Sequence, residues 1–214
     1  DHTFSEKDIL SVRYAFDRTI DPTAGVNFPG FFTSQVQRYH NIVANWTHIF
    51  SPTLTNELRV PYNRILFDFP NDATHPLAQT MPEIAFTQVS NIGVSISYPQ
   101  GRIANNYILQ DTMSWVKGKH TFRFGFDLLQ QRSRQTAPSV LRGRAAYALS
   151  NTGGEFYHSF ANYVDDFGGG GSVTRDFGSA TYYPELFRQA YFIQDRWEVR
   201  DNVTLTLGLR WGGF

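Results

Sequence analysis

The chain has 214 residues, and its 19 Lys and Arg residues balance 19 Asp and Glu residues, so no net charge attracts nucleic acid or acidic substrates. It contains no cysteine, which excludes a disulfide framework, a thiolate metal site and a cysteine nucleophile. Aromatic residues make up 16% of the chain, which favours an all-β protein with one apolar face. No apolar run is long enough for a transmembrane helix, whereas alternating strands with polar loops remain compatible with a membrane barrel.

The first half of the chain predicts three β-strands. Residues 8–17 alternate apolar side chains with mainly polar ones, which is the period of two expected of a strand. Residues 39–50 form the second strand, and a tight turn at 51–53 leads into the third strand at 54–67. Pro61 lacks a backbone donor, so a bulge or an unpaired point is expected at that position.

The second half predicts five or six more strands, which gives a total of eight or nine. The last arm of the closing hairpin has the clearest pattern, because apolar residues occupy every second position from Val203 to Trp211. The segment 172–177 is the optional ninth strand. The other predicted strands of this half are 104–115, 121–128, 140–149, 186–199 and 203–211.

The connections alternate between tight turns and long loops. Tight turns are predicted at 51–53, 117–119 and 200–202, and long loops at 18–38 and 68–103. Short turns at one end and long loops at the other are typical of an outer-membrane β-barrel. The sequence therefore predicts an antiparallel meander that is part of such a barrel or closes into one.

Residues 151–171 interrupt the strand pattern and predict an irregular or short helical insertion. Phe160, Tyr163 and Phe167 have helical spacing, and glycines at 168–171 are suited to end such a helix. The whole chain, 1–214, is otherwise treated as a single β-barrel segment.

One hairpin pattern occurs at 107–127, again at 191–211, and more weakly at 46–62. Trp115 and Trp197 stand near the tight turns of the first two copies. These side chains are predicted to lie in an aromatic girdle at a membrane interface. The polar residues that alternate with the apolar ones are predicted to face a watery lumen, namely Arg13, Glu57, Arg59, Arg123, Asp127, Thr204, Thr206 and Arg210.

Asp111 and Asp195 do not fit the alternation, because each falls on the same face as its apolar neighbours. A carboxylate that faces lipid is unfavourable. Two explanations remain open. Either a β-bulge turns these side chains to the other face, or the face that carries them is buried against protein.

Four arginines near one end of the predicted strands are the main candidate for a binding site, namely Arg132, Arg134, Arg142 and Arg144. Guanidinium groups bind phosphate, so contact with lipid phosphate or anionic surface sugars is one interpretation. The simpler alternative is a solvated loop rich in arginine. The six histidines lack metal-ligand spacing, and no catalytic residue, metal site or cofactor is predicted.

Three segments resemble the barrel of TonB-dependent receptors: SPTLTNELR at 51–59, ILQDTMSWVKGKHTFRFGFD at 108–127 and YFIQDRWEVRDNVTLTLGLRW at 191–211. The most similar group is the Oar-like subfamily with a carboxypeptidase-regulatory-like N-terminal domain, and residues 160–164 resemble a further segment of that group. The resemblance implies an outer-membrane barrel of about 22 strands that imports a large substrate. It also implies that the TonB complex acts through a plug domain and a TonB box, which are regions absent from this chain.

On this interpretation the chain is a fragment of a transporter wall in the bacterial outer membrane and is not an enzyme. Its expected partners are outer-membrane lipid, the rest of the barrel or other copies of the chain, and the TonB complex, with no nucleic acid. A second interpretation is a self-assembling β-rich subunit, in an extracellular assembly, whose sheet is completed by neighbouring chains. A third is a soluble all-β binding module.

The period of two also predicts which side chains share a face. Phe122, Phe124, Phe126, Leu205, Leu207 and Leu209 are expected on one apolar surface, and Arg123, Thr204, Thr206 and Arg210 on the other.

The turns at 117–119 and 200–202 are expected at one end of the sheet, opposite the loop 68–103. This arrangement requires 140–149 and 172–177 as intervening strands. The last strand, 203–211, is expected to pair on both edges, on one with 186–199 and on the other with the first strand or another copy.

Overall fold

The computed structural model describes residues 1–25, 28–137, 140–152, 155–167 and 170–214, without the side chains of 150–152 and 155–156. Part of the predicted glycine stop at 168–171 therefore lies outside the described residues. Within the described ranges, no helix is both long enough and apolar enough to cross a membrane.

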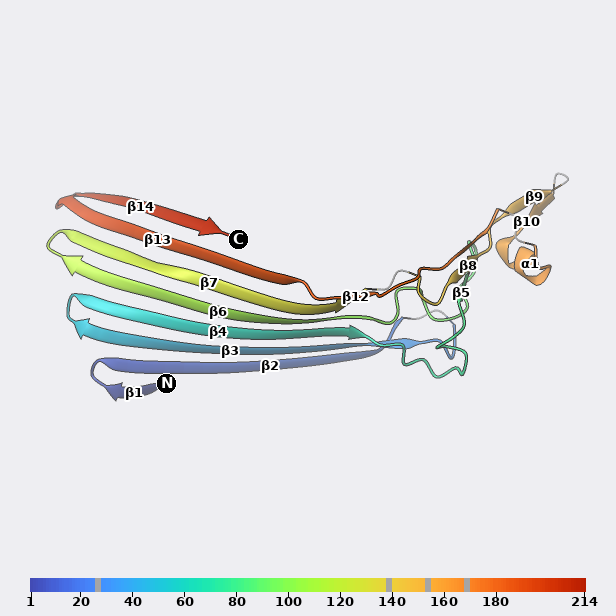
Figure 1. The fold of residues 1–214 in the computed structure, drawn as a ribbon, viewed down its shortest axis with the longest axis horizontal. Helices are drawn as coiled ribbons and strands as arrows, with labels where there is room; N and C mark the ends of the chain where they lie inside the picture. Colours follow the sequence, from blue (N-terminus) through green and yellow to red (C-terminus); the bar gives the residue numbers. More distant parts are fainter. Residues whose placement is uncertain (26–27, 138–139, 153–154, 168–169) are drawn as a thin grey trace.

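Nine strands form one antiparallel sheet, which confirms the predicted all-β meander (Figure 1). Eight strands follow in the order β1-β2-β3-β4-β6-β7-β13-β14, and the short β12 pairs with β7. The strands are β1 (His2–Ser5), β2 (Asp8–Gly25), β3 (Thr33–Ser51), β4 (Leu54–Phe69), β6 (Gln100–Lys117), β7 (His120–Thr136), β12 (Thr181–Tyr182), β13 (Glu185–Arg200) and β14 (Val203–Gly213).

The predicted facing of the side chains is confirmed by the register of the ladder. Phe124 lies opposite Ile193, which lies opposite Leu209, so these three side chains share one face. Arg123 lies opposite Gln194 on the other face. The two hairpins that resemble each other in sequence, β6–β7 and β13–β14, are adjacent in the sheet, so their apolar rows join into one surface.

The short turns lie together at one end of the sheet and the long connections at the other, as predicted (Figure 1). The predicted route between the turns at 117–119 and 200–202 is wrong, however. After β7 the chain passes through the connections beyond the sheet and then returns beside β7, first as β12 and then as β13, so no full-length strand is needed between them. Only Arg144–Ala146 of the predicted strand 140–149 is extended, and neither it nor Ser172–Thr174 joins the main sheet.

The long loops are shorter than the sequence predicted. The loop expected at 18–38 is replaced by strand up to Gly25 and from Thr33, with a register shift between Asp21 and Gly25. Pro22 falls in that irregular stretch of the ladder, whereas Pro29 and Gly30 lie in the shorter connection between Gly25 and Thr33. The loop expected at 68–103 runs only between Phe69 and Gln100. At Pro61 the β4–β6 pairing is interrupted while its register is unchanged, so the expected unpaired point is present without a bulge.

The long connections fold into a small cap beyond the end of the sheet (Figure 1). Strands β5 (Glu83–Ala85), β8 (Arg144–Ala146) and β11 (Ser172–Thr174) form a three-stranded sheet, and β9 (Ser150–Thr152) pairs with β10 (Glu155–Tyr157). Helix α1 (Ser159–Val164) lies within the segment 151–171 for which a short helix was predicted. A buried cluster of Phe31, Ala78, Val94 and Tyr98 packs where the cap meets the sheet, against Phe69 and others.

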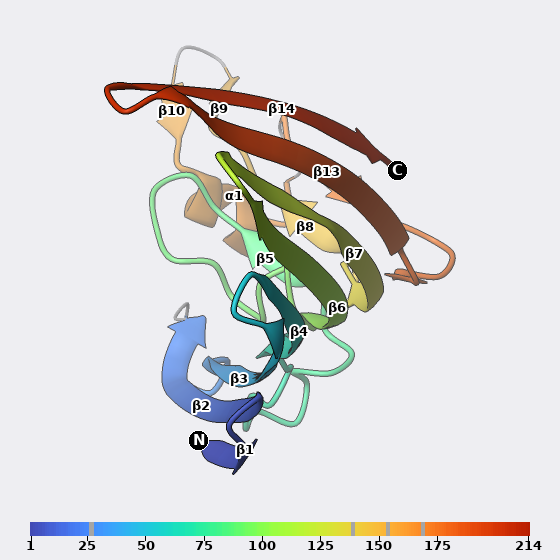
Figure 2. The same ribbon diagram turned by 90° about the vertical axis from the view of Figure 1, so that its left-hand side faces the viewer.

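The sheet is curved, and its two edges are far apart in chain order and in space (Figure 2). Among the described strands β14 pairs only with β13, and β1 and β2 lie at the opposite edge. The expectation that β14 closes onto the first strand is therefore wrong for this structure. The chain folds as an open, barrel-type wall.

Candidate functional surfaces of the wall and its cap

One face of the sheet, which we call the outer face, is apolar and largely exposed. Leu207 is 63% exposed and Leu209 is 78% exposed, although both are in the middle of a regular strand. The other exposed apolar side chains of this face include Val12, Tyr14, Phe16, Ile42, Trp46, Val60, Tyr107, Leu109, Phe124, Tyr191, Ile193, Leu205 and Trp211. A contiguous apolar surface of this size is unfavourable in water and is suited to contact with lipid or protein.

Trp115 and Trp197 both lie on the outer face close to the short turns, as their positions in the sequence predicted. The Trp115 ring is tilted against Phe122 at a centroid distance of 5.7 Å, and Lys117 lies 5.2 Å from the same indole. The Trp197 ring stacks on His120 at 5.3 Å. The position suits an aromatic girdle at a membrane interface, which remains a prediction for these two residues.

Asp111 and Asp195 do lie on the outer face, because the ladders on both sides of each residue run without a register shift. The bulge explanation is therefore wrong for these two aspartates. Each carboxylate instead has a polar partner on the neighbouring strand. Asn56 donates to both oxygens of Asp111 at 2.9 and 3.0 Å, and His120 Nδ1 lies 2.7 Å from Asp195 Oδ2. Hydrogen bonding to a cross-strand partner lowers the cost of placing a carboxylate on an apolar surface.

A third pair of this kind was not found from the sequence. Asp8 Oδ1 lies 2.6 Å from His48 Nδ1 and accepts a hydrogen bond from Trp46 Nε1 at 3.2 Å. The residues are 40 positions apart, and only the β2–β3 register brings them together. A His directly opposite an Asp across two strands would have predicted this pair, but that position can be recognised only when the register is known.

The opposite face, which we call the inner face, carries the polar row predicted from the sequence. All eight predicted lumen residues alternate with the outer-face side chains in the ladder. Gln110 donates to Asp127 at 3.2 Å, and Gln131 donates to Asn106 at 2.9 Å. A shallow depression of about 220 Å³ is lined by charged groups of both signs, including Glu57, Arg59, Asp127 and Arg210. This face can offer hydrogen bonds and charge to a polar solute.

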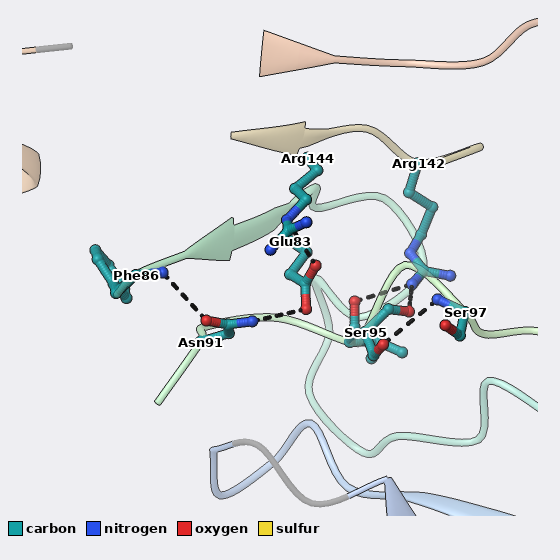
Figure 3. A network of polar contacts seen from close by, with 8 residues as sticks. Glu83, Phe86, Asn91, Ser95, Ser97, Arg142 and Arg144 are labelled. Carbon is teal, nitrogen blue, oxygen red and sulfur yellow. Dashed lines mark hydrogen bonds and ion pairs between the residues drawn. The ribbon is translucent and has the colours of Figure 1, made fainter. Parts of the chain in front are cut away.

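The predicted cluster of four arginines is divided by the structure. Arg132 and Arg134 lie on the outer face of β7, whereas Arg142 and Arg144 lie in the cap and have protein partners (Figure 3). Arg142 donates to the carbonyl of Val94 at 3.0 Å, to that of Ser95 at 2.8 Å, and also to that of Tyr98. Burial lowers the pKa of the Arg142 guanidinium from its usual range. The sequence-based grouping of all four arginines into one anion site is therefore wrong.

The second arginine of the cap belongs to a polar network centred on a buried carboxylate (Figure 3). Arg144 Nε lies 3.4 Å from Glu83 Oε2, and Asn91 donates to Glu83 Oε1 at 3.0 Å. The Asn91 side-chain oxygen in turn accepts the backbone N–H of Phe86 at 3.1 Å. These contacts join β5 and β8 to the loop that follows β5, so both arginines stabilise the cap.

Aromatic rings hold helix α1 against the same small sheet. Phe86 lies 5.6 Å from Phe160 and 5.5 Å from Tyr163, and Tyr147 lies 5.3 Å from Tyr163, all edge-on. The helical spacing noticed in the sequence is thus used for packing within the cap. In the part of the chain that the structure describes, no group of three or more potential ligands is placed to hold a metal ion.

A curved antiparallel sheet with an apolar outer face, a polar inner face and short turns at one end is the wall of an outer-membrane-type β-barrel. The family comparison agrees: a family model described as "Outer membrane beta barrel domain" matches residues 1–214. The chain belongs to this family and is located in the bacterial outer membrane.

One solved structure is similar in fold, the outer membrane transporter YddB from Escherichia coli. The TM-score is 0.53 at 12% sequence identity, and the match covers 98% of this chain and 25% of that chain. This chain therefore spans about a quarter of the transporter that it resembles, and the likeness concerns the fold alone. A search of curated proteins found no match.

Proposed function

We propose that the chain forms part of the wall of an outer-membrane transporter that imports a large substrate with energy from the TonB complex. The observation that carries this proposal is the division of one continuous sheet into an apolar outer face and a polar, charged inner face. The fold likeness to an outer membrane transporter and the sequence resemblance to TonB-dependent receptors support it. On this proposal the chain has a transport role rather than an enzymatic one.

Accessibility labelling in the outer membrane tests the facing of the two surfaces. Single cysteines replace an outer-face residue, Leu207, and an inner-face residue of the same strand, Thr206, in the protein as it exists in the cells that produce it. Because residues 1–214 contain no cysteine, the introduced cysteine is the only one of this segment that can be labelled. A lipid-soluble quencher should affect only a probe at 207, and a small charged maleimide should react only at 206. Equal reaction at both positions would refute a wall between lipid and water.

Dependence on the TonB complex is tested separately. Cells that lack the TonB complex should keep the protein in the outer membrane but should no longer accumulate its substrate. Because the substrate is unknown, the readout is the loss, upon TonB removal, of solutes that accumulate only in cells with the intact protein. Equal accumulation with and without TonB would refute energised import while leaving the barrel wall intact.

A second candidate function is self-assembly, and the open edges of the sheet favour it. β14 has no proline and only one charged residue, Arg210, so its free edge is suited to pairing with another strand. If other copies supply that strand, the protein extracted from its membrane should have the mass of a multiple of the chain, and cysteines placed at the two edges should crosslink between copies. A single chain with edge crosslinks only within itself would exclude this candidate.

A further inference from the structure

A band of arginines crosses the outer face at its long-loop end. All five side chains are exposed, and their shared face is evident only from the ladder. They are Arg18 on β2, Arg38 on β3, Arg64 on β4, and Arg132 and Arg134 on β7, and we call this set the outer arginine belt.

The register places these arginines on the same face as the apolar rows. Arg18 lies directly opposite Arg38 across β2 and β3. Arg64 and Arg132 belong to one row, because each lies opposite Asn105 of β6. Since side chains alternate strictly between faces, a residue in the same row as an outer-face residue also points outward.

The belt has few protein partners. Arg132 lies 3.8 Å from Glu185, and both side chains are more than half exposed, so water screens this ion pair and it holds Arg132 only weakly. Arg64 donates to the side-chain oxygen of Asn105 at 3.2 Å. Within the described residues, the other three arginines of the belt make no hydrogen bond or ion pair.

The belt also has an excess of positive charge. Glu185 and Asp68 are the carboxylates near it on the same face, against five guanidinium groups. Asp68 shares a surface depression of about 330 Å³ with Arg134, Ile103 and other residues at this end of the sheet. The local charge therefore favours anionic groups outside the sheet.

The height of the belt corresponds to the far side of the membrane. Arg132 and Arg134 lie about ten and twelve residues beyond Phe122, whose ring packs on Trp115 near the short turns. At about 3.3 Å per residue and a strand tilt of about 40°, this separation is about 25–30 Å along the membrane normal. The apolar band of an outer-membrane barrel is about 25 Å tall. The belt is thus at headgroup level when the short-turn aromatics are at the opposite interface.

We propose that the outer arginine belt binds the phosphate groups of lipid molecules in the outer leaflet of the membrane. Guanidinium groups form charge-assisted, often bidentate hydrogen bonds with phosphate. Tyr14, Phe16 and Tyr107 of the outer face lie directly beside the belt on its short-turn side, where acyl chains would contact them. A lipid satisfies both surfaces at once, whereas a free anion would use only the belt. The proposal rests on the membrane orientation of the wall, and does not depend on transport or on TonB.

The test uses the protein purified from its membrane in a neutral detergent and titrated with diphosphoryl lipid A, with bound lipid counted by native mass spectrometry. In the belt variant all five arginines are replaced by glutamine. The matched control replaces Arg102 and Arg188, which are also exposed and near the same end but face inward, by glutamine. A second variant replaces the five belt arginines by lysine, which keeps the charge without the planar fork.

The wild-type protein and the inward-facing control should bind with affinities within about 2-fold of each other, and the glutamine belt variant should bind at least 10-fold more weakly. The lysine variant should lose less affinity than the glutamine variant. Dephosphorylated lipid A should bind wild type and belt variant equally, and millimolar inorganic phosphate should not displace the bound lipid. A displaced lipid would show a free-phosphate site and overturn the lipid proposal.

Equal affinity of the wild-type protein and the glutamine variant for lipid A would refute lipid binding by the outer arginine belt, even if the protein is in the outer membrane. Failure of the proposed wall would be seen differently, as equal labelling at positions 206 and 207. If the glutamine variant does not fold, the lysine variant provides the test. Equal affinity of the lysine variant for lipid A and for dephosphorylated lipid A would exclude a phosphate contact.

Discussion

Replacing Arg142 by Met should open the cap locally without unfolding the sheet. The guanidinium donates to the carbonyls of Val94, Ser95 and Tyr98, and methionine keeps an unbranched apolar stem but removes every donor. Hydrogen bonds to a charged group contribute about 1.5–3 kcal/mol each, and the three share one guanidinium and are not additive. We therefore expect a loss of about 3 kcal/mol in the local opening free energy, which is about a 150-fold larger open fraction.

Amide hydrogen exchange measures this opening directly in the protein held in detergent micelles. Ile84 and Ile92 exchange hydrogen bonds across their bridge at 2.8 and 2.9 Å, and the Tyr98 amide donates to Ser95 at 3.0 Å. These three amides should lose protection in Arg142→Met, whereas amides in the middle of β7 should keep theirs.

Arg175→Met is the matched control, because Arg175 is an exposed arginine in the cap region that stacks over Phe177. It should leave the amides of Ile84 and Ile92 unchanged. Unchanged exchange in Arg142→Met, or an equal increase in Arg175→Met, would refute the assignment of a stabilising role to the Arg142 contacts.

Three other substitutions have clear expected outcomes. Gly125→Ala should prevent normal assembly of β6 with β7, because a Cβ at this position would lie 1.9 Å from the Asp111 carbonyl oxygen. Its control, Gly212→Ala, meets only ordinary contacts at 3.5 Å and should fold. Heat-modifiable gel mobility distinguishes the two variants, and normal mobility of both would contradict the close approach at Gly125. His120→Leu should lower the free energy of unfolding by about 1–3 kcal/mol in urea titrations, because it leaves the Asp195 carboxylate without its partner. The same substitution should cost less in a protein that already carries Asp195→Leu. An equal cost of His120→Leu in both backgrounds would show that the two residues are not coupled. Leu207→Pro should reduce assembly because it removes a backbone donor from β14, and Leu207→Val should not; equal amounts of assembled protein would indicate that this part of the strand is not paired.

The main sheet was predictable because its sequence has one dominant constraint, the period of two. Long strands repeat this constraint many times, so Val203 to Trp211 could be placed on the correct face without any tertiary information. The segments 140–149 and 172–177 also contain residues that favour strands, but each is short. A short alternating pattern does not determine which sheet the strand joins. Both contribute three-residue strands to the cap, where the partner is decided by loop packing.

The arginine cluster shows the same limit at the level of a site. Arg132 and Arg134 continue the alternation of β7, so their common face follows from the strand that carries them. Beyond Thr136 the strand ends, and the period no longer predicts direction. Arg142 turns toward three backbone carbonyls of a loop that is more than 40 residues earlier in the chain. No local pattern identifies such a partner, because it depends on how the loop folds back.

The free edge of β14 places a final constraint on the molecule. A strand in lipid must have every backbone N–H and C=O paired, because no water is present to replace a missing hydrogen bond. β14 pairs only with β13 in the described strands, and β1 covers only the end of β2 nearest the short turns. The outer face extends to both edges, so both edges lie at membrane depth. A wall located in the outer membrane therefore requires further strands at both edges, and the crosslinking experiment on the edges determines whether one chain or several supply them.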